Sequence, residues 1–253
     1  MKNLLTIFLF VLTTGVLMGQ TATEVITKAD EKMQGKSNRG TMTMKIVRPK
    51  WTREITMKVW SSGADYSLVL ITKPARDEGT GTLKRKKELW SWQPSIDRII
   101  KMPPSMMMQS WMGSDFTNDD LVNQSSMVVD YVHEFAGDTT VGSYDCWKIM
   151  MYPMDEAAVV WGKLEAYISK VDYFQLILKY YDEDEFLINT MTLSDIKEMG
   201  GRVIPTKMEM SPAENLDQKT VIIYRDFEYD IDLREHFFSI QNLNVLNASF
   251  SER

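Results

Sequence analysis

The sequence predicts a mainly β protein: one antiparallel sheet, meandering or barrel-like, with a few short helices. Two observations favour this fold class. From Gly40 onward, apolar and polar residues alternate with a period of two in about a dozen short stretches, and turn signals separate them. No long helical pattern interrupts the series. Because parallel strands need long crossover connections that are usually helical, a βαβ fold is excluded.

One helix is expected before the strands. Residues Thr21–Gly35 place Val25, Ile26, Ala29 and Met33 at helical spacing. The glycine that closes this range is a natural helix stop. We therefore expect a helix on the N-terminal side of the sheet.

The strands follow from the period-two pattern, and several of them are apolar on both faces. A curled sheet with a solvated outer face should be apolar only inside. Apolar residues on both faces mean that helices cover one face or that one face lines a ligand cavity, and the pattern leaves both open. The expected strands are Met42–Ile46, Glu54–Trp60, Tyr66–Thr72, Thr80–Arg85, Glu88–Trp92, Arg98–Met102, Val128–Phe135, Tyr144–Met151, Lys163–Ser169, Phe174–Tyr181, Phe186–Ile196, Val203–Met210 and Thr220–Tyr229.

Residues 1–19 are interpreted as a secretory signal peptide. Lys2 supplies a short positive region, and Leu4–Leu12 is an apolar run shorter than the roughly 20 residues that span a bilayer. Cleavage is expected after Gly19, and no cysteine follows the run, which excludes a lipid-modified signal. The alternative is a buried N-terminal helix. Residues 20–253 show no linker and no repeat, so we expect them to form a single exported, soluble domain.

The middle of the chain carries the most unusual segment. Met102–Phe116 is rich in methionine and contains two adjacent prolines, which cannot donate to a strand ladder. A helix start follows, with Thr117 as N-cap and two aspartates in the first turn. Phe116 and Leu121 have the spacing of a hydrophobic staple. The pattern predicts an apolar segment latched onto a short helix.

This methionine-rich segment has three interpretations. It is a buried plug in the barrel mouth, or a movable cover over an acyl-chain pocket, for which adaptable methionine side chains are suited. A Cu(I) site is the third, but three adjacent methionines cannot face one point, and neither His nor Cys stands nearby. Seven tryptophans spread along the chain favour a pocket as a set, although each alone is equally explained as core. The predicted lipid-binding residues of cavity and lid are Trp60, Trp90, Trp92, Met102, Met106, Met107, Met108, Trp111, Met112 and Phe116.

Catalytic and metal-binding patterns are absent from the sequence, so we expect neither an enzyme nor a cofactor. His133 and His236 have no metal-ligand spacing around them, and no serine lies in a nucleophile elbow. The single cysteine, Cys146, excludes an internal disulfide and is interpreted as a buried small hydrophobe.

The charge of the chain argues against nucleic acid as a partner, because its formal net charge is −6 and phosphate neutralisation needs a basic surface. Lys84–Lys87 is the one positive cluster. We interpret it as a solvated turn or strand edge, where lysines block edge pairing. A docking surface for anionic lipid head groups or an acidic partner is the alternative.

Several stretches resemble the LolA-like family of periplasmic outer-membrane lipoprotein-sorting proteins. They are Thr43–Trp51 (TMKIVRPKW), Asp65–Pro74 (DYSLVLITKP), Trp92–Lys101 (WQPSIDRIIK) and above all Pro103–Val122 (PPSMMMQSWMGSDFTNDDLV). The resemblance continues in Ala157–Gly162 (AAVVWG), Tyr181–Asp184 (YDED), Asn189–Met191 (NTM), Asp195–Pro205 (DIKEMGGRVIP) and Phe237–Leu243, and so spans the expected mature chain.

The resemblance implies an unclosed antiparallel β-barrel, LolA/LolB-like, with helices over its concave face and an interior that holds acyl chains. The expected function is that of a periplasmic carrier of lipids or lipoproteins toward the outer membrane. The expected partners are an inner-membrane lipid exporter or an outer-membrane acceptor. The alternative is a non-enzymatic adaptor whose barrel is plugged and which binds a membrane transporter, and a hydrolase is a distant third.

Overall fold

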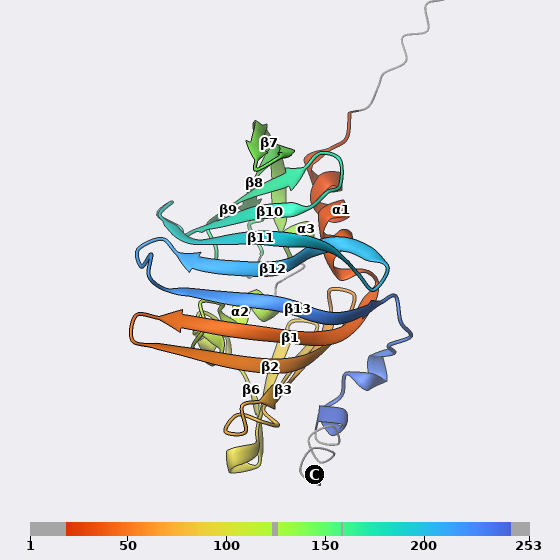
Figure 1. The fold of residues 1–253 in the computed structure, drawn as a ribbon, viewed down its shortest axis with the longest axis vertical. Helices are drawn as coiled ribbons and strands as arrows, with labels where there is room; N and C mark the ends of the chain where they lie inside the picture. The colour runs from red at the N-terminus through yellow and green to blue at the C-terminus, as the bar shows by residue number, and fades with distance from the viewer. Residues whose placement is uncertain (1–18, 123–125, 158, 244–253) are drawn as a thin grey trace, which may run out of the picture.

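The structure, a computed structural model, describes residues 19–122, 126–157 and 159–243. The predicted signal peptide lies outside the described residues except for Gly19. The described chain forms one thirteen-stranded antiparallel sheet that curls without closing, together with a few short helices (Figure 1). The predicted fold class is therefore confirmed.

The strands follow the alternating pattern of the sequence closely. Most predicted strands differ from the observed ones by a few residues at their ends, which is the usual uncertainty of strand boundaries. The strands are β1 (Ser37–Arg48), β2 (Trp51–Ser62), β3 (Tyr66–Lys73), β4 (Gly81–Arg85), β5 (Glu88–Gln93), β6 (Arg98–Lys101), β7 (Tyr131–Val141), β8 (Tyr144–Pro153), β9 (Lys163–Ser169), β10 (Gln175–Tyr181), β11 (Leu187–Met199), β12 (Arg202–Pro212) and β13 (Lys219–Tyr229).

One predicted strand is wrong at its start. Val128 lies in a short helix, α3 (Ser126–Val129), and β7 begins only at Tyr131. Met127 and Val128 pack against the core beneath the first helix. This tertiary contact outweighs the β propensity of the two valines that suggested a strand.

The order of the strands explains how the sheet is covered. Neighbours in sequence are neighbours in the sheet, except that β1 pairs with β13, so that β6 and β7 become the two edges. The chain must therefore cross from one edge to the other between residues 101 and 131. This crossing segment, residues 102–130, holds η2 (Pro104–Met106), η3 (Trp111–Gly113), α2 (Asn118–Val122) and α3.

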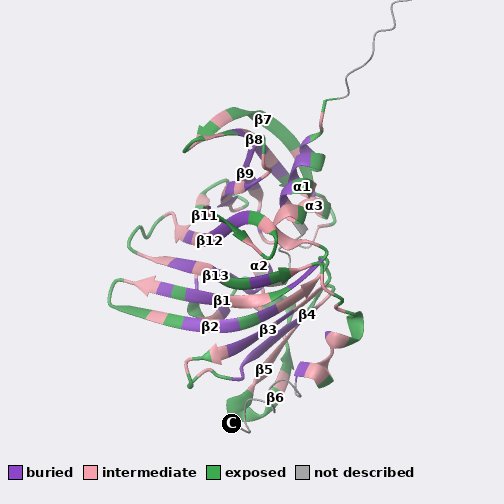
Figure 2. Cartoon of the chain, turned by 45° about the vertical axis from the view of Figure 1, so that its right-hand side comes forward, coloured by how far each residue is buried: buried purple, intermediate pink, exposed green. Residues whose placement is uncertain are grey.

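The predicted helix is confirmed as α1 (Ala22–Gln34). Thr21 and Glu24 form a reciprocal capping box at its start, and Gly35 ends it with a positive φ of 62°. Its buried face, which includes Val25 and Ile26, packs against β7, β9, β12 and α3. Figure 2 shows the buried stretches that run along the strands beside α1 and α3. Helix α1 thus covers one half of the concave face.

Candidate functional site

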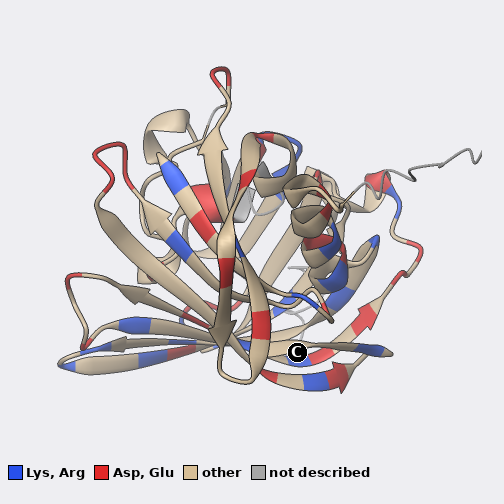
Figure 3. Ribbon diagram, turned by 90° about the horizontal axis from the view of Figure 1, so that it is seen from above, with Lys and Arg blue, Asp and Glu red and all other residues tan. Residues whose placement is uncertain are grey.

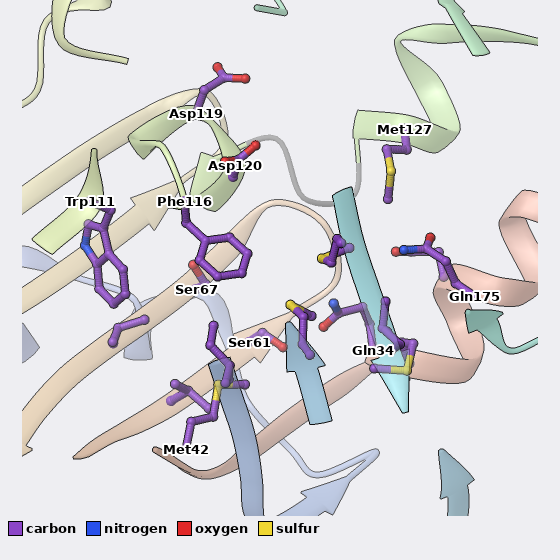
Figure 4. A pocket seen from close by; sticks show the side chains of 18 of the residues that line it. Gln34, Met42, Ser61, Ser67, Trp111, Phe116, Asp119, Asp120, Met127 and Gln175 are labelled. Carbon is purple, nitrogen blue, oxygen red and sulfur yellow. The ribbon is translucent and has the colours of Figure 1, made fainter. Parts of the chain in front are cut away.

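A cavity of about 190 Å³ lies between the concave face of the sheet, α1 and the crossing segment. Figure 4 shows Trp111 and Phe116 on one side of this cavity and Met127 and Gln175 on the other. Methionine and aromatic side chains form much of its wall. They are Met33, Met42, Met57, Met127, Met191, Met208, Trp60, Trp111, Phe116, Tyr131, Trp161, Tyr180, Tyr224 and Phe227.

The crossing segment is fastened to the sheet by an ion pair. Arg48 on β1 reaches both carboxylate oxygens of Asp115, with Nη2–Oδ1 at 3.0 Å and Nη1–Oδ2 at 3.1 Å, and its Nη2 also donates to the Gly113 carbonyl. Thr220 on β13 donates to the same carboxylate at 2.7 Å. The side chains of the pair are only 14% and 8% exposed. A bidentate and nearly dry pair of this kind holds the segment in one place.

A second fastening begins α2. Thr117 and Asp120 cap each other, since Thr117 Oγ1 accepts from the Asp120 N–H and an Asp120 oxygen accepts from the Thr117 N–H. The predicted N-cap is thus confirmed. The other Asp120 oxygen accepts from Trp161 Nε1 at 3.1 Å, and burial raises the pKa of this carboxyl. The predicted staple involves Leu121, whose side chain lies outside the described residues.

Three of the predicted site residues are among those that line the cavity: Trp60 on β2, and Trp111 and Phe116 in the crossing segment. Trp111 is buried and its indole N–H lies 3.4 Å from Thr82 Oγ1 on β4. Met112 packs beside it against the core between β1 and β3. The end of the predicted lid therefore reaches the cavity.

Trp60 and the remaining predicted residues make most of their contacts away from the cavity. Trp60 borders the cavity, but its ring packs against Phe237 on the outer face of the sheet, with 5.8 Å between ring centroids. Trp90 and Trp92 pack in the same outer cluster. The methionines of the lid are not in the cavity wall, and Met108 is 56% exposed. That the set Trp60, Trp90, Trp92, Met102, Met106, Met107, Met108 and Met112 binds lipid stays a prediction.

The cavity instead takes its methionines from the strands. Met42 on β1, Met57 on β2 and Met208 on β12 occupy alternate positions that face inward. Their spacing is visible in the sequence, but spacing cannot tell which face of a strand will be concave. The methionines of the cavity wall therefore come from strands that the sequence analysis did not single out as site residues.

The basic run Lys84–Lys87 is only partly the solvated turn that the sequence predicts. Lys86 and Lys87 form the exposed turn between β4 and β5, but Lys84 is 6% exposed. It alternates with Leu83, which belongs to the outer cluster, and so faces inward beside Thr82. Its interpretation as a solvated residue is wrong, because strand alternation carries it inside.

Two charged groups in this region have displaced pKa values. Burial lowers the pKa of Lys84 to about 8, and burial raises the pKa of Asp30 on α1 to about 6, with Glu31 adding to the rise. Desolvation disfavours the charged form of either group. Both groups therefore sit in a much drier place than their strand and helix neighbours at the surface.

The structure also bears on the cysteine, on metal-binding clusters, on membrane-spanning helices and on the distribution of charge. Cys146 is fully buried between Phe174 and Leu176, as predicted, and burial raises the pKa of its thiol. Within residues 19–122, 126–157 and 159–243, no group of three or more His, Cys, Asp or Glu side chains could hold a metal ion. Among the same residues, no helix is both long and apolar enough to cross a membrane. Basic and acidic side chains are interspersed along the strands and loops (Figure 3).

A family model described only as "Uncharacterized protein" matches residues 63–245, which is well over half of the chain. The chain belongs to this family. The matched range includes strands β3 to β13. No curated protein matches the sequence.

Three solved structures resemble the chain over 88% of its length. A DUF1329 family protein from Desulfovibrio piger is 22% identical with a TM-score of 0.80, and 97% of it is covered. A putative outer membrane lipoprotein-sorting protein domain from Vibrio parahaemolyticus is 19% identical with a TM-score of 0.76, covered over 97%. A LolA superfamily protein from Nitrosomonas europaea is 21% identical with a TM-score of 0.77, covered over 100%. The predicted LolA-like resemblance is thereby confirmed at the level of the fold.

Proposed function

We propose that this protein carries the acyl chains of a lipid or lipoprotein through an aqueous compartment, with the chains enclosed between the concave face and the crossing segment. The observation that carries the proposal is the cavity itself, which is walled by methionine and aromatic side chains. Each methylene moved from water into such a wall contributes about 0.8 kcal/mol. Methionine walls adapt to chains of different shape, because the side chain is unbranched and polarizable.

The size of the cavity supports a cover that moves. An apolar cavity of about 150 Å³ is large enough for one benzene molecule. At about 190 Å³, the present cavity encloses only part of an acyl chain. Loading a whole chain therefore requires the crossing segment to shift, and the Arg48–Asp115 pair is the contact that such a shift would break.

The setting follows from the fold family. Proteins with this fold include a putative outer membrane lipoprotein-sorting protein domain. We infer a periplasmic location and non-enzymatic transfer, with a membrane exporter as donor or an outer-membrane protein as acceptor. The charged groups beside the cavity are then there to accommodate cargo and not to carry out a reaction.

The test is to fill the cavity. Val69 on β3 lines it, and Val69→Trp places an indole in the empty space. The matched control is Val203→Trp on β12, because Val203 is exposed on the outer face. Each form is secreted to the periplasm of a Gram-negative host, purified without detergent and extracted for mass spectrometry.

The unmodified protein and Val203→Trp are expected to yield co-purifying lipid in near-stoichiometric amount. Val69→Trp is expected to lose most of it, while its free energy of unfolding changes by only about 1–3 kcal/mol. Absence of lipid from the unmodified protein, combined with failure to take up lipid from vesicles, would contradict the carrier and favour the adaptor with a plugged barrel.

A further inference from the structure

One rim of the cavity is polar, and the pairing of the strands places its groups in a single row. Asn38 on β1 pairs with Ser61 on β2, Ser61 pairs with Ser67 on β3, and Ser67 pairs with Lys84 on β4. Directly paired residues on adjacent strands point to the same face. The row therefore runs across four strands on the concave side, where Asn38, Ser61 and Ser67 line the cavity and Lys84 continues the row just beyond its wall.

The row borders an apolar interior. One step inward along the strands, Val59 pairs with Val69, and both line the cavity. Beyond them come Met57 and Met42, which are also in the wall. The concave face thus changes from polar to apolar over a few residues, in the way that an amphiphile changes from head to chain.

Helix α1 places two more polar side chains over the same rim. Asp30 and Gln34, one turn apart, both line the cavity, and Asn38 Nδ2 donates to the Gln34 carbonyl at 2.9 Å. Figure 4 shows Gln34, Ser61 and Ser67 around the hollow. The rim is therefore built from both the sheet and the helix that covers it.

Several of these groups have hydrogen-bonding capacity to spare. The charge of Lys84 is favoured electrostatically by Asp65, Asp30 and Asp119, yet the side chains of Asp30 and Lys84 make no direct hydrogen bond or ion pair with another described residue. The hydroxyls of Ser61 and Ser67 also have no hydrogen-bond partner within the described part of the chain. A charge held in a dry place without a partner is costly. A ligand that supplies complementary groups would remove that cost.

We propose that this rim binds a zwitterionic lipid head group, with its ammonium toward Asp30, its phosphate toward Lys84, and its remaining polar atoms toward Ser61, Ser67 and Gln34. The inference rests on the proposed carrier function and adds the class of cargo. An anionic head group would match Lys84 but oppose Asp30. An uncharged head group would leave both side chains without a direct hydrogen-bond or ion-pair partner.

The experiment offers three lipids with identical oleoyl chains in equal amounts. Mixed vesicles that contain dioleoyl phosphatidylethanolamine, dioleoyl phosphatidylglycerol and dioleoylglycerol together are incubated with the purified protein. The vesicles are then removed by centrifugation. Mass spectrometry then measures the bound lipids. The unmodified protein is expected to hold phosphatidylethanolamine in at least about fivefold excess over either other lipid.

Two variants test which charged group of the lipid head each side chain recognises. Asp30→Asn is expected to abolish the preference for phosphatidylethanolamine over phosphatidylglycerol. Lys84→Met is expected to abolish the preference of both phosphate-bearing lipids over dioleoylglycerol. The matched controls, Asp226→Asn and Lys45→Met, change exposed residues of β13 and β1 and should keep the full selectivity. Circular dichroism confirms that each variant is folded.

The outcomes separate the two proposals. Equal uptake of all three lipids by the unmodified protein, or preference for phosphatidylglycerol, would overturn the zwitterionic head group and leave the carrier function standing. Uptake of no lipid would overturn both. Because the selectivity of the unmodified protein is measured in its own sample, the first test does not depend on the variants folding.

Discussion

Strands β2 to β5 carry apolar residues on both faces. The concave face borders a cavity and is the hollow face, whereas the outer face is filled by closely packed side chains. On the concave face, Val59 and Val69 border the cavity. Residues of the crossing segment, such as Trp111 and Phe116, also line it. On the outer face, Leu68 and Leu70 are fully buried beneath Phe238 and Leu243 of the C-terminal segment. The two faces therefore use similar residues for different purposes.

The fit of the outer face is close. Gly81 on β4 leaves a notch for Leu243, since a Cβ at this glycine would lie 2.4 Å from Leu243 Cδ1. The rings of Tyr66 and Phe238 lie 5.6 Å apart, and those of Trp60 and Phe237 5.8 Å apart. Tight packing of this kind stabilises the fold, whereas the empty space on the other face is where we propose that cargo binds.

The largest loss of stability is expected when a buried side chain is removed from the packed outer face. Phe238→Ala removes a fully buried ring from the outer cluster. We expect the free energy of unfolding, measured by urea titration, to fall by about 3–5 kcal/mol. Lipid carried by the molecules that remain folded should be unchanged. A large loss of lipid from folded protein would show that the two faces are not separate.

The next largest loss of stability is expected when the ion pair between the crossing segment and β1 is broken. Arg48→Ala leaves the nearly buried Asp115 carboxylate without its cation. We expect a loss of about 2–4 kcal/mol in the free energy of unfolding and faster exchange of bound lipid with vesicles. The control is Arg39→Ala, because Arg39 and Glu228 form a pair in which both side chains are 54% exposed, and its loss should cost less than about 1 kcal/mol. Equal costs for the two variants would contradict a fastening role for Arg48.

A smaller effect should appear with pH at the polar rim. Burial raises the pKa of Asp30 to about 6, above its ordinary value of 3.8. The protonated carboxyl is thus favoured in the folded state, and its stabilising contribution is present at acidic pH and lost as the pH rises through about 6. Asp30→Asn cannot ionise, so lipid-free Asp30→Asn should be more stable than the unmodified protein by about 1–2 kcal/mol near pH 8, allowing for partial exposure. Urea titrations should show this difference disappearing toward pH 4, and a difference independent of pH would contradict the assignment.

The smallest loss of stability is expected when a side chain in the cavity wall is shortened. Val69→Ala removes two methyl groups that already border empty space, so the free energy of unfolding should fall by only about 1 kcal/mol or less. Its neighbour Leu70 points to the filled face and is fully buried, so Leu70→Ala should cost about 2–5 kcal/mol. Urea titration of the two variants compares adjacent residues of one strand. Similar losses would mean that the cavity is filled in solution.

Much of the fold and part of the site could be predicted from the sequence. Alternation identified the strands, the apolar stripe and closing glycine identified α1, and Thr117 marked the start of α2. These signals are local, because a strand or a cap depends on residues a few positions apart. Trp111 and Phe116 are predicted site residues because they lie in the apolar, methionine-rich segment before the start of α2, and both line the cavity.

The remaining features depended on contacts between distant residues. Alternation groups Lys84 with Thr82 and Trp90 with Trp92, but it does not say which group faces inward. The groups are distinguished by long-range packing, because the C-terminal segment covers the outer tryptophans. The sequence by itself determined the elements and showed that several strands are apolar on both faces. Only the tertiary structure decided which apolar face is filled and which is left hollow, because curvature and long-range packing are properties of the whole sheet and not of any strand.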